Sequence, residues 1–299
     1  MQVGNSKVSV INPEKLSSKK IESNKFIEEK TENINTSDRF SSEIFSNLKN
    51  GKEILSIGSK GEKVKEIKQT LIDLGFWTGG SIEENENGTY GKATDEFDNK
   101  TADAVKNFQD SRGLQKTGKI DSKTMEELIK VAPAKGETLW SPSYAKKAKN
   151  VYPSNILPNG KKARIVVDLS EHRLFLFKEN STELEKVYSI ASGKISNGKT
   201  GETLTPTGIR IVDNKLKDPS WLGKKLWNDE KVFGPKLIGL GKYDLNSKKI
   251  SNIGTEIHGT NNPNSIGTNA SHGCIRMLNT AIEDLYKRVK VGDIVVVQK

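Results

Sequence analysis

The dominant period of the hydrophobic pattern differs between the first and second halves of this 299-residue chain, and that difference limits the folds that are possible. Between residues 59 and 131, apolar side chains recur every three or four positions in three short runs, which is typical of amphipathic helices. From Arg164 they form short apolar or alternating runs, first at residues 164–169 and 173–177, which is typical of strands. The sequence therefore predicts an α+β multidomain chain, in which a small three-helix domain precedes a mainly β domain with a sandwich or barrel-like sheet.

Local signals place the ends of the three helices. The first is expected to start at a capping box formed by Ser59 and Glu62 and to end before Gly75. The second and third are expected to start at Asp98 and Asp121, each of which has a threonine three residues later.

Later elements are less regular. A late helix is expected to begin at a capping box of Thr280 and Glu283. Between the two opening strands, His172 falls in a hairpin turn, and we predict that it is a surface residue. Further strand-like runs occur at residues 187–191, 208–212, 256–258 and 293–297.

Composition divides the chain into four segments. Residues 1–51 are rich in Lys, Glu, Ser and Asn and are predicted to be a disordered or weakly ordered arm. Residues 52–132 form the helical domain, and residues 163–299 the β-rich domain. Between them, residues 133–162 contain four prolines and no sustained period, which predicts a semi-rigid linker.

Charge and hydropathy exclude several classes of protein. The formal net charge is +10, which favours anionic polymers as partners. The lysines are spread along the chain without aromatic interleaving, so nucleic acid is not expected as a partner. No apolar run is long enough for a transmembrane segment, and residues 1–15 lack the apolar core of a signal peptide. A mature form, a trimmed chain and another export route are all compatible with this N-terminal sequence.

The residues with the clearest chemistry surround Cys274, the single cysteine. A thiol needs an imidazole or another electropositive neighbour before it becomes a good nucleophile, and His258 and His272 both lie nearby in sequence. Gly273 would let backbone N–H groups converge on a developing oxyanion. Two alternatives to a catalytic nucleophile are an inert buried cysteine and a zinc site. The zinc site is disfavoured because the usual ligand spacings are absent and no supporting carboxylate is evident nearby.

Residues 257–260 (IHGT) and 271–277 (SHGCIRM) resemble the active-site signature of the L,D-transpeptidase catalytic domain family, and the resemblance extends from about residue 164 to residue 297. It implies that Cys274 is the nucleophile and His258 the general base, oriented by the carbonyl of Gly259. It also implies an oxyanion region at His272 and Gly273, with no metal and no cofactor. The implied substrate-binding residues are Arg276, Ser271, Thr260, Trp221 and Trp227.

Two of those assignments have alternatives. Arg276 is placed to pair with a substrate carboxylate, but a structural salt bridge behind the loop would explain it equally well. Trp221 and Trp227 fall in residues 213–243, a long Lys- and Gly-rich stretch that is expected to be an irregular lid over the donor site. Both tryptophans could instead be packing residues.

The resemblance further implies a reaction on peptidoglycan in the cell wall or outside the cell, with a spore compartment also possible. Cys274 would attack the bond before the terminal D-alanine of a tetrapeptide stem and form an acyl-enzyme. An amine of a neighbouring stem would then complete a 3→3 cross-link, which contributes to wall biogenesis and cell shape. With water as the acceptor, the same enzyme would be an L,D-carboxypeptidase or endopeptidase. Sensitivity to carbapenems follows from the same thiolate.

The helical segment resembles a second family. Residues 58–61 (GSKG), 74–76 (LGF), 101–109 (TADAVKNFQ) and 113–114 (GL) resemble the three-helix, type 1 peptidoglycan-binding domain. Phe76 and Phe108 are expected in its core, whereas Trp77 and Tyr90 are candidates for stacking on sugar. A weak wall-binding domain on a linker would keep the catalytic cleft near an insoluble substrate.

Overall fold

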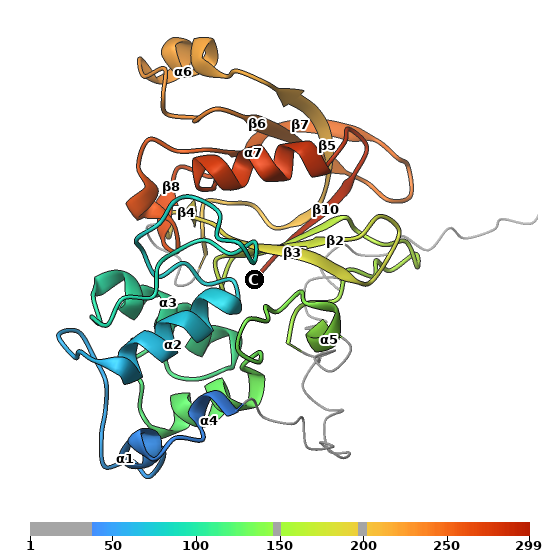
Figure 1. Ribbon diagram of the computed structural model, residues 1–299. Helices are drawn as coiled ribbons and strands as arrows, with labels where there is room; N and C mark the ends of the chain where they lie inside the picture. The colour runs from blue at the N-terminus through green and yellow to red at the C-terminus, as the bar shows by residue number, and fades with distance from the viewer. Residues whose placement is uncertain (1–37, 146–150, 197–201) are drawn as a thin grey trace, which may run out of the picture. The chain divides into compact units, whose positions relative to one another are not determined.

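The computed structural model describes residues 38–145, 151–196 and 202–299 (Figure 1). The arm predicted at residues 1–51 therefore lies mostly outside the described residues. Its last part contains two 3-10 turns (Asp38–Phe40 and Glu43–Phe45) and helix α1 (Ser46–Lys49). Phe40, Phe45 and Leu48 are buried in the core of the helical domain, so the prediction of a weakly ordered arm is wrong for residues 38–51.

Three helices follow, as the periodicity predicted: α2 (Glu62–Asp73), α3 (Asn99–Ser111) and α4 (Ser122–Val131). The caps predicted for α3 and α4 are confirmed, because Asp98 and Asp121 each accept a hydrogen bond of 2.8 Å from the backbone N–H three residues later. Both bonds satisfy an N–H group that the helix itself leaves without a partner.

The capping box predicted for α2 is wrong. Gly61 occupies the N-cap position, with φ at 109°, and makes no side-chain cap. Ser59 Oγ instead accepts a hydrogen bond from the backbone N–H of Ser56, so its hydroxyl closes the preceding turn. As predicted, the helix ends before Gly75.

The β-rich domain contains an eight-stranded sheet in the order β3-β2-β1-β10-β5-β6-β7-β9 and a separate parallel pair, β4-β8. Neighbours within the large sheet are antiparallel except β1–β10 and β7–β9. The strands are β1 (Ile165–Asp168), β2 (Arg173–Phe177), β3 (Leu184–Ser189), β4 (Ser192–Gly193), β5 (Gly208–Leu216), β6 (Leu237–Tyr243), β7 (Ile250–His258), β8 (Asn269–Ser271), β9 (Ile275–Arg276) and β10 (Ile294–Gln298).

The irregular lid predicted at residues 213–243 is only partly correct. This stretch holds the end of β5, the short helix α6 (Ser220–Trp227) and all of β6. Strand β6 was not predicted because it contains Gly239 and Gly241, and glycine is uncommon in strands. A Cβ atom at Gly239 would lie 2.3 Å from Asn214, so the close pairing at the irregular β5–β6 register requires glycine.

Helix α7 (Asn279–Arg288) lies across one face of the sheet (Figure 1). Its side chains Ala281, Ile282 and Leu285 share a core with residues of β1, β2, β6 and β7. The capping box predicted at Thr280 is wrong, because the helix begins at Asn279 and the Thr280 hydroxyl donates to the carbonyl of Ile82. A short 3-10 turn, η4 (Pro263–Ser265), lies in the loop between β7 and β8.

The opposite face of β1–β3 packs against the helical domain. Phe175, Phe177 and Val187 belong to the same buried cluster as the side chains of α2, α3 and α4. Every residue of β2 is buried, as expected for a strand covered on both faces. Gly75 permits the contact, since its φ is 86° and a Cβ atom there would lie 2.6 Å from a methyl group of Val187.

The segment predicted to be a linker is also packed. It contains helix α5 (Pro142–Ala145), while Leu139, Tyr144 and Leu157 are buried. Leu139 and Tyr144 join the cluster shared by the two domains. The simple picture of a freely tethered wall-binding domain is therefore wrong for the described residues, because the helical and β-rich domains bury a common apolar interface.

His172 corrects another prediction. It is 6 % exposed, and its Nδ1 lies 3.0 Å from the side-chain oxygen of Asn107 on α3. Burial lowers the pKa of His172 to about 4. The hairpin turn that carries it faces the helical domain, which a local sequence pattern does not reveal.

No helix in the described part of the chain combines the length and the apolar character needed to cross a membrane.

Candidate active site

Cys274 lies in the short loop between β8 and β9. Strand β9 pairs with β7 in parallel, so that Ile275 is opposite Ile257 and Arg276 is opposite His258. The backbone N–H of Met277 extends this contact by donating to the carbonyl of His258. This pairing brings the two motifs that the sequence singled out to one end of the sheet.

The closest polar partner of the thiol is a carboxylate. Cys274 Sγ lies 2.8 Å from Glu256 Oε2, while the carbonyl of Gly254 is 4.0 Å away. Burial and the charge of Glu256 raise the pKa of Cys274 to about 12, although the Glu256 backbone N–H and Arg276 act in the opposite direction. The thiol is therefore neutral at neutral pH in this state.

Glu256 was not among the site residues predicted from the sequence, and the expectation that no carboxylate lies near the thiol is wrong. A usable signal was present, because Glu256 precedes His258 by two positions on a strand, and residues two apart point to the same face. What the pattern lacked was the register that places Cys274 opposite this part of β7.

His258 is buried and oriented by the backbone. Its Nδ1 lies 2.6 Å from the carbonyl oxygen of Gly259, and the ring of Phe233 meets it edge-on at 4.9 Å between centroids. Burial lowers the pKa of His258 to about 4. Among the described residues, no hydrogen bond joins His258 to Cys274, but both side chains line one pocket.

Ser271 and Gly273 shape the loop before the nucleophile. Ser271 Oγ donates to the carbonyl of Cys274 and accepts a hydrogen bond of 3.1 Å from the N–H of Gly273. That N–H group is therefore already used within the loop. Gly273 has φ at 137°, and a Cβ atom there would lie 3.2 Å from the carbonyl oxygen of Leu204, so a side chain would strain the turn.

The pocket around Cys274 has a volume of about 350 Å³. One wall is apolar and comes from α6 and the segment that follows it. The other wall carries Glu256, His258 and Arg276, whose side chains are charged or polar. The apolar wall is formed by Leu222, Leu226, Trp227, Val232 and Phe233.

Helix α6 places its two tryptophans differently. Trp227 is 51 % exposed, lines the pocket and lies 5.1 Å from the ring of His272 between centroids. Trp221 is 58 % exposed and is not among the described residues that line this pocket. Neither is a buried packing residue.

Arg276 and Thr260 also differ in position. Arg276 lines the pocket, and within the described ranges it forms no salt bridge and its buried Nε has no hydrogen-bond partner. The alternative of a structural salt bridge is therefore not observed there. Thr260 is buried and outside the pocket lining, with its N–H bound to the side chain of Asn279 at 2.8 Å.

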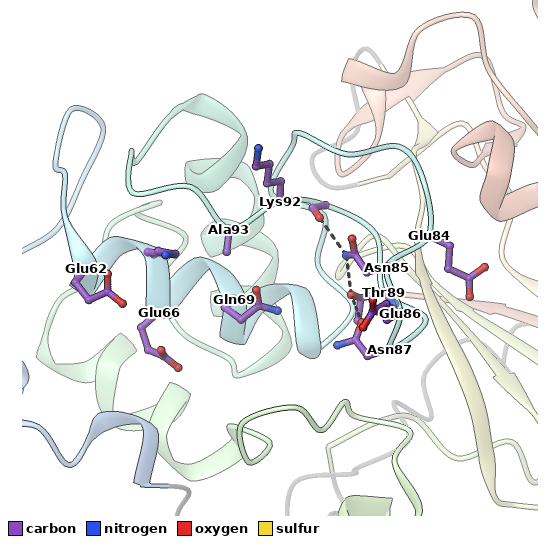
Figure 2. Close-up of a pocket in the computed structure, with 12 residues that line it drawn as sticks. Glu62, Glu66, Gln69, Glu84, Asn85, Glu86, Asn87, Thr89, Lys92 and Ala93 are labelled. Atoms are coloured by element: carbon purple, nitrogen blue, oxygen red, sulfur yellow. Dashed lines mark hydrogen bonds between the residues drawn. The ribbon is translucent and has the colours of Figure 1, made fainter.

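A second pocket, of about 710 Å³, lies in the helical domain between α2 and the loop at residues 84–93 (Figure 2). Its lining is polar. Asn85 shapes the loop by donating to Thr89 Oγ1 and to the carbonyl of Gly91. Other lining side chains are Glu62, Lys65, Glu66, Gln69, Glu86, Asn87 and Lys92.

Trp77 and Tyr90 do not reach solvent near this pocket. They are 5 % and 8 % exposed, respectively, and belong to the core beneath the sheet. Tyr90 lies 6.3 Å from Tyr188 between ring centroids. Their proposed stacking on sugar is therefore not supported, whereas Phe76 and Phe108 are core residues as predicted.

Across residues 38–145, 151–196 and 202–299, no group of three or more His, Cys, Asp or Glu side chains is arranged to hold a metal ion.

Comparison with known proteins identifies both domains. Residues 162–297 match the family model described as “L,D-transpeptidase catalytic domain”, and residues 60–128 match the “Putative peptidoglycan binding domain”. Among curated relatives, “Putative L,D-transpeptidase YkuD” of Bacillus licheniformis is 36 % identical over 129 residues, which cover 43 % of this chain and 61 % of the relative. “Probable L,D-transpeptidase YcfS” of Escherichia coli is 27 % identical over 146 residues, covering 46 % and 44 %.

The chain thus spans about half the length of the curated relatives it matches. Among solved structures, an L,D-transpeptidase from Xylanimonas cellulosilytica has a TM-score of 0.42 at 21 % identity, covering 82 % of this chain and 97 % of that one. From the two family matches, residues 162–297 belong to the L,D-transpeptidase catalytic domain family and residues 60–128 to the peptidoglycan-binding domain family.

Proposed function

We propose that this chain is a cysteine-dependent L,D-transpeptidase, which removes the terminal D-alanine of a peptidoglycan tetrapeptide stem and forms 3→3 cross-links. The observation that carries the proposal is the shared pocket of Cys274 and His258, with the imidazole fixed by the Gly259 carbonyl. Because Nδ1–H donates to that carbonyl, Nε2 is left as the basic nitrogen. This arrangement fits a nucleophile with a neighbouring general base.

The first half-reaction starts from two neutral groups. The pKa of Cys274 is raised to about 12 and that of His258 is lowered to about 4, so a preformed thiolate–imidazolium pair is disfavoured. The thiol proton instead passes to His258 as sulfur attacks the stem carbonyl. His258 then protonates the leaving D-alanine amine, and the acyl group remains on Cys274 as a thioester.

Arg276 and the loop position the donor. The Arg276 guanidinium supplies a cation for a stem carboxylate, and its buried Nε without a partner in the described part of the chain supports that role. Trp227 with His272 offers an aromatic surface for the stem. The same thiol would be acylated by the strained carbonyl of a carbapenem.

A test of the resting ionisation uses the single cysteine as its own reporter. Alkylation of Cys274 by iodoacetamide should be slow at neutral pH and rise about tenfold for each pH unit from about pH 7 to about pH 10, since the thiolate fraction grows in that proportion below the pKa. Labelling rates measured by intact mass check this expectation. A rate that levels off near neutral pH would instead indicate a preformed thiolate.

We further propose that the helical domain binds the wall. Its pocket carries amide, carboxylate and ammonium side chains that suit the hydroxyl groups and charged stems of peptidoglycan (Figure 2). The net charge of +10 favours additional attraction to anionic wall polymers. Activity in the cell wall or outside the cell follows from such a substrate. Co-sedimentation with purified sacculi measures this binding.

The decisive product assay uses a disaccharide-tetrapeptide. We expect D-alanine release together with 3→3 dimers that mass spectrometry can identify. Release of D-alanine with only tripeptide monomers would favour the alternative, an L,D-carboxypeptidase that uses water. If neither D-alanine nor 3→3 dimers form, the proposed function is contradicted.

A further inference from the structure

Glu256 is a carboxylate that the mechanism above does not use. It lies on β7, two residues before His258, and its Oε2 is 2.8 Å from Cys274 Sγ. Among the described residues that line the pocket, it is the only carboxylate, and within the described ranges it takes part in no salt bridge. A carboxylate with no ion-pair partner in the described part of the chain therefore faces the nucleophile.

The partner of this carboxylate changes during the reaction. In the resting protein, the Cys274 thiol can donate its proton to Glu256. Once sulfur carries an acyl group, it has no proton to donate, and the half-buried carboxylate loses this partner. A partly buried carboxylate without a hydrogen-bond partner is costly, so the acyl-enzyme favours a cationic hydrogen-bond donor at this position.

On the basis of the proposed function, we propose that Glu256 binds the ammonium group of the acceptor stem beside the thioester and takes its proton, which selects an amine over water. An attacking nitrogen stands about 3–3.5 Å from the carbonyl carbon. That carbon is bonded to Sγ, and Glu256 Oε2 lies 2.8 Å from Sγ. The same nitrogen can therefore hydrogen-bond to the carboxylate while it approaches the carbon.

Transfer to the acceptor amine moves two protons and breaks the C–S bond. The ammonium gives one proton to Glu256, and the free amine adds to the thioester carbonyl. A second N–H proton passes to His258 as the amide forms, and from there to solvent. The C–S bond breaks with its electron pair on sulfur, which takes the proton held by Glu256. The resting thiol–carboxylate pair is thereby restored.

The test measures the partition of the acyl-enzyme in the full chain. Wild type, Glu256→Gln and Glu256→Asp are incubated with a disaccharide-tetrapeptide, and the ratio of 3→3 dimer to tripeptide is determined, while intact mass follows the acyl-enzyme. Glu256→Gln should lower this ratio by about tenfold to a hundredfold, because both charge attraction and proton acceptance are lost. Glu256→Asp keeps a carboxylate and should recover most of the ratio.

Two controls separate this role from a structural one. Glu230→Gln removes the same charge from an exposed residue outside the pocket lining and should leave the ratio within about twofold of wild type. Hydroxylamine, which is largely uncharged at neutral pH, needs no ammonium site. Transfer of the acyl group from Cys274 to hydroxylamine should therefore be preserved in Glu256→Gln.

Three results would overturn the inference while the proposed function stands: an unchanged dimer ratio in Glu256→Gln, an equal loss of transfer to hydroxylamine, or failure of Glu256→Gln to form the acyl-enzyme. The last would place Glu256 in the first half-reaction. If wild type itself forms no acyl-enzyme and no dimer, the proposed function fails first.

Discussion

Cys274→Ala is expected to abolish both D-alanine release and dimer formation, with kcat/KM falling by about 10⁴-fold or more, because Cys274 is the single cysteine of the chain and a thioester needs its sulfur. The side chain is only partly buried, so the substitution should leave the fold intact. The measurement is D-alanine release from a tetrapeptide donor, followed over time.

A matched variant and a binding assay sharpen this prediction. Cys274→Ser keeps the shape of the side chain and should also be inactive, since a hydroxyl group is harder to ionise than a thiol. Binding of Cys274→Ala to sacculi should persist, because the pocket of the helical domain is separate. Activity of Cys274→Ala within tenfold of wild type would contradict the account.

Arg173→Ala is expected to lower the free energy of unfolding by about 3–5 kcal/mol, because it removes one member of a buried ion pair. Arg173 is 2 % exposed, and its Nη1 donates to the carbonyl of Leu74 at 2.8 Å while its Nε donates to Glu171 at 2.9 Å. The guanidinium also stacks on the ring of Phe76, with 4.2 Å between its carbon and the ring centroid. Urea unfolding measures the loss.

Arg112→Ala is the matched control. Arg112 pairs with Glu127 at 3.2 Å, but both side chains are partly exposed, so its loss should cost about 0–1 kcal/mol. Because Arg173 joins the two domains, the unfolding of wild type should be one cooperative transition. A cost for Arg173→Ala no greater than for Arg112→Ala would show that the domain interface contributes little to stability.

Local signals succeeded where short-range physics decides the structure. Asp98 and Asp121 cap their helices as predicted, since a cap depends only on residues three positions away. The two histidine-containing motifs were recognised from their own residues, whereas the parallel pairing of β7 with β9 that brings them to one end of the sheet is a longer-range contact.

Contacts between distant segments could not be predicted. His172 looked like a surface residue because nothing local shows that its turn packs on Asn107 of α3. Trp77 and Tyr90 are close to glycines in the sequence, which suggested exposed turns. Both are buried, because they pack in one cluster with side chains of the sheet. Glu256 was missed for a similar reason, because its contact with Cys274 depends on strand register.

A covalent intermediate on Cys274 is expected during turnover, and intact-mass spectrometry of the protein tests for it most directly. Wild type that is incubated with excess tetrapeptide donor and then quenched should carry an adduct on Cys274. The mass of this adduct should equal that of the donor acyl group after loss of D-alanine, and hydroxylamine should remove it. Release of D-alanine that continues without any adduct, and at the same rate in Cys274→Ala, would contradict the account.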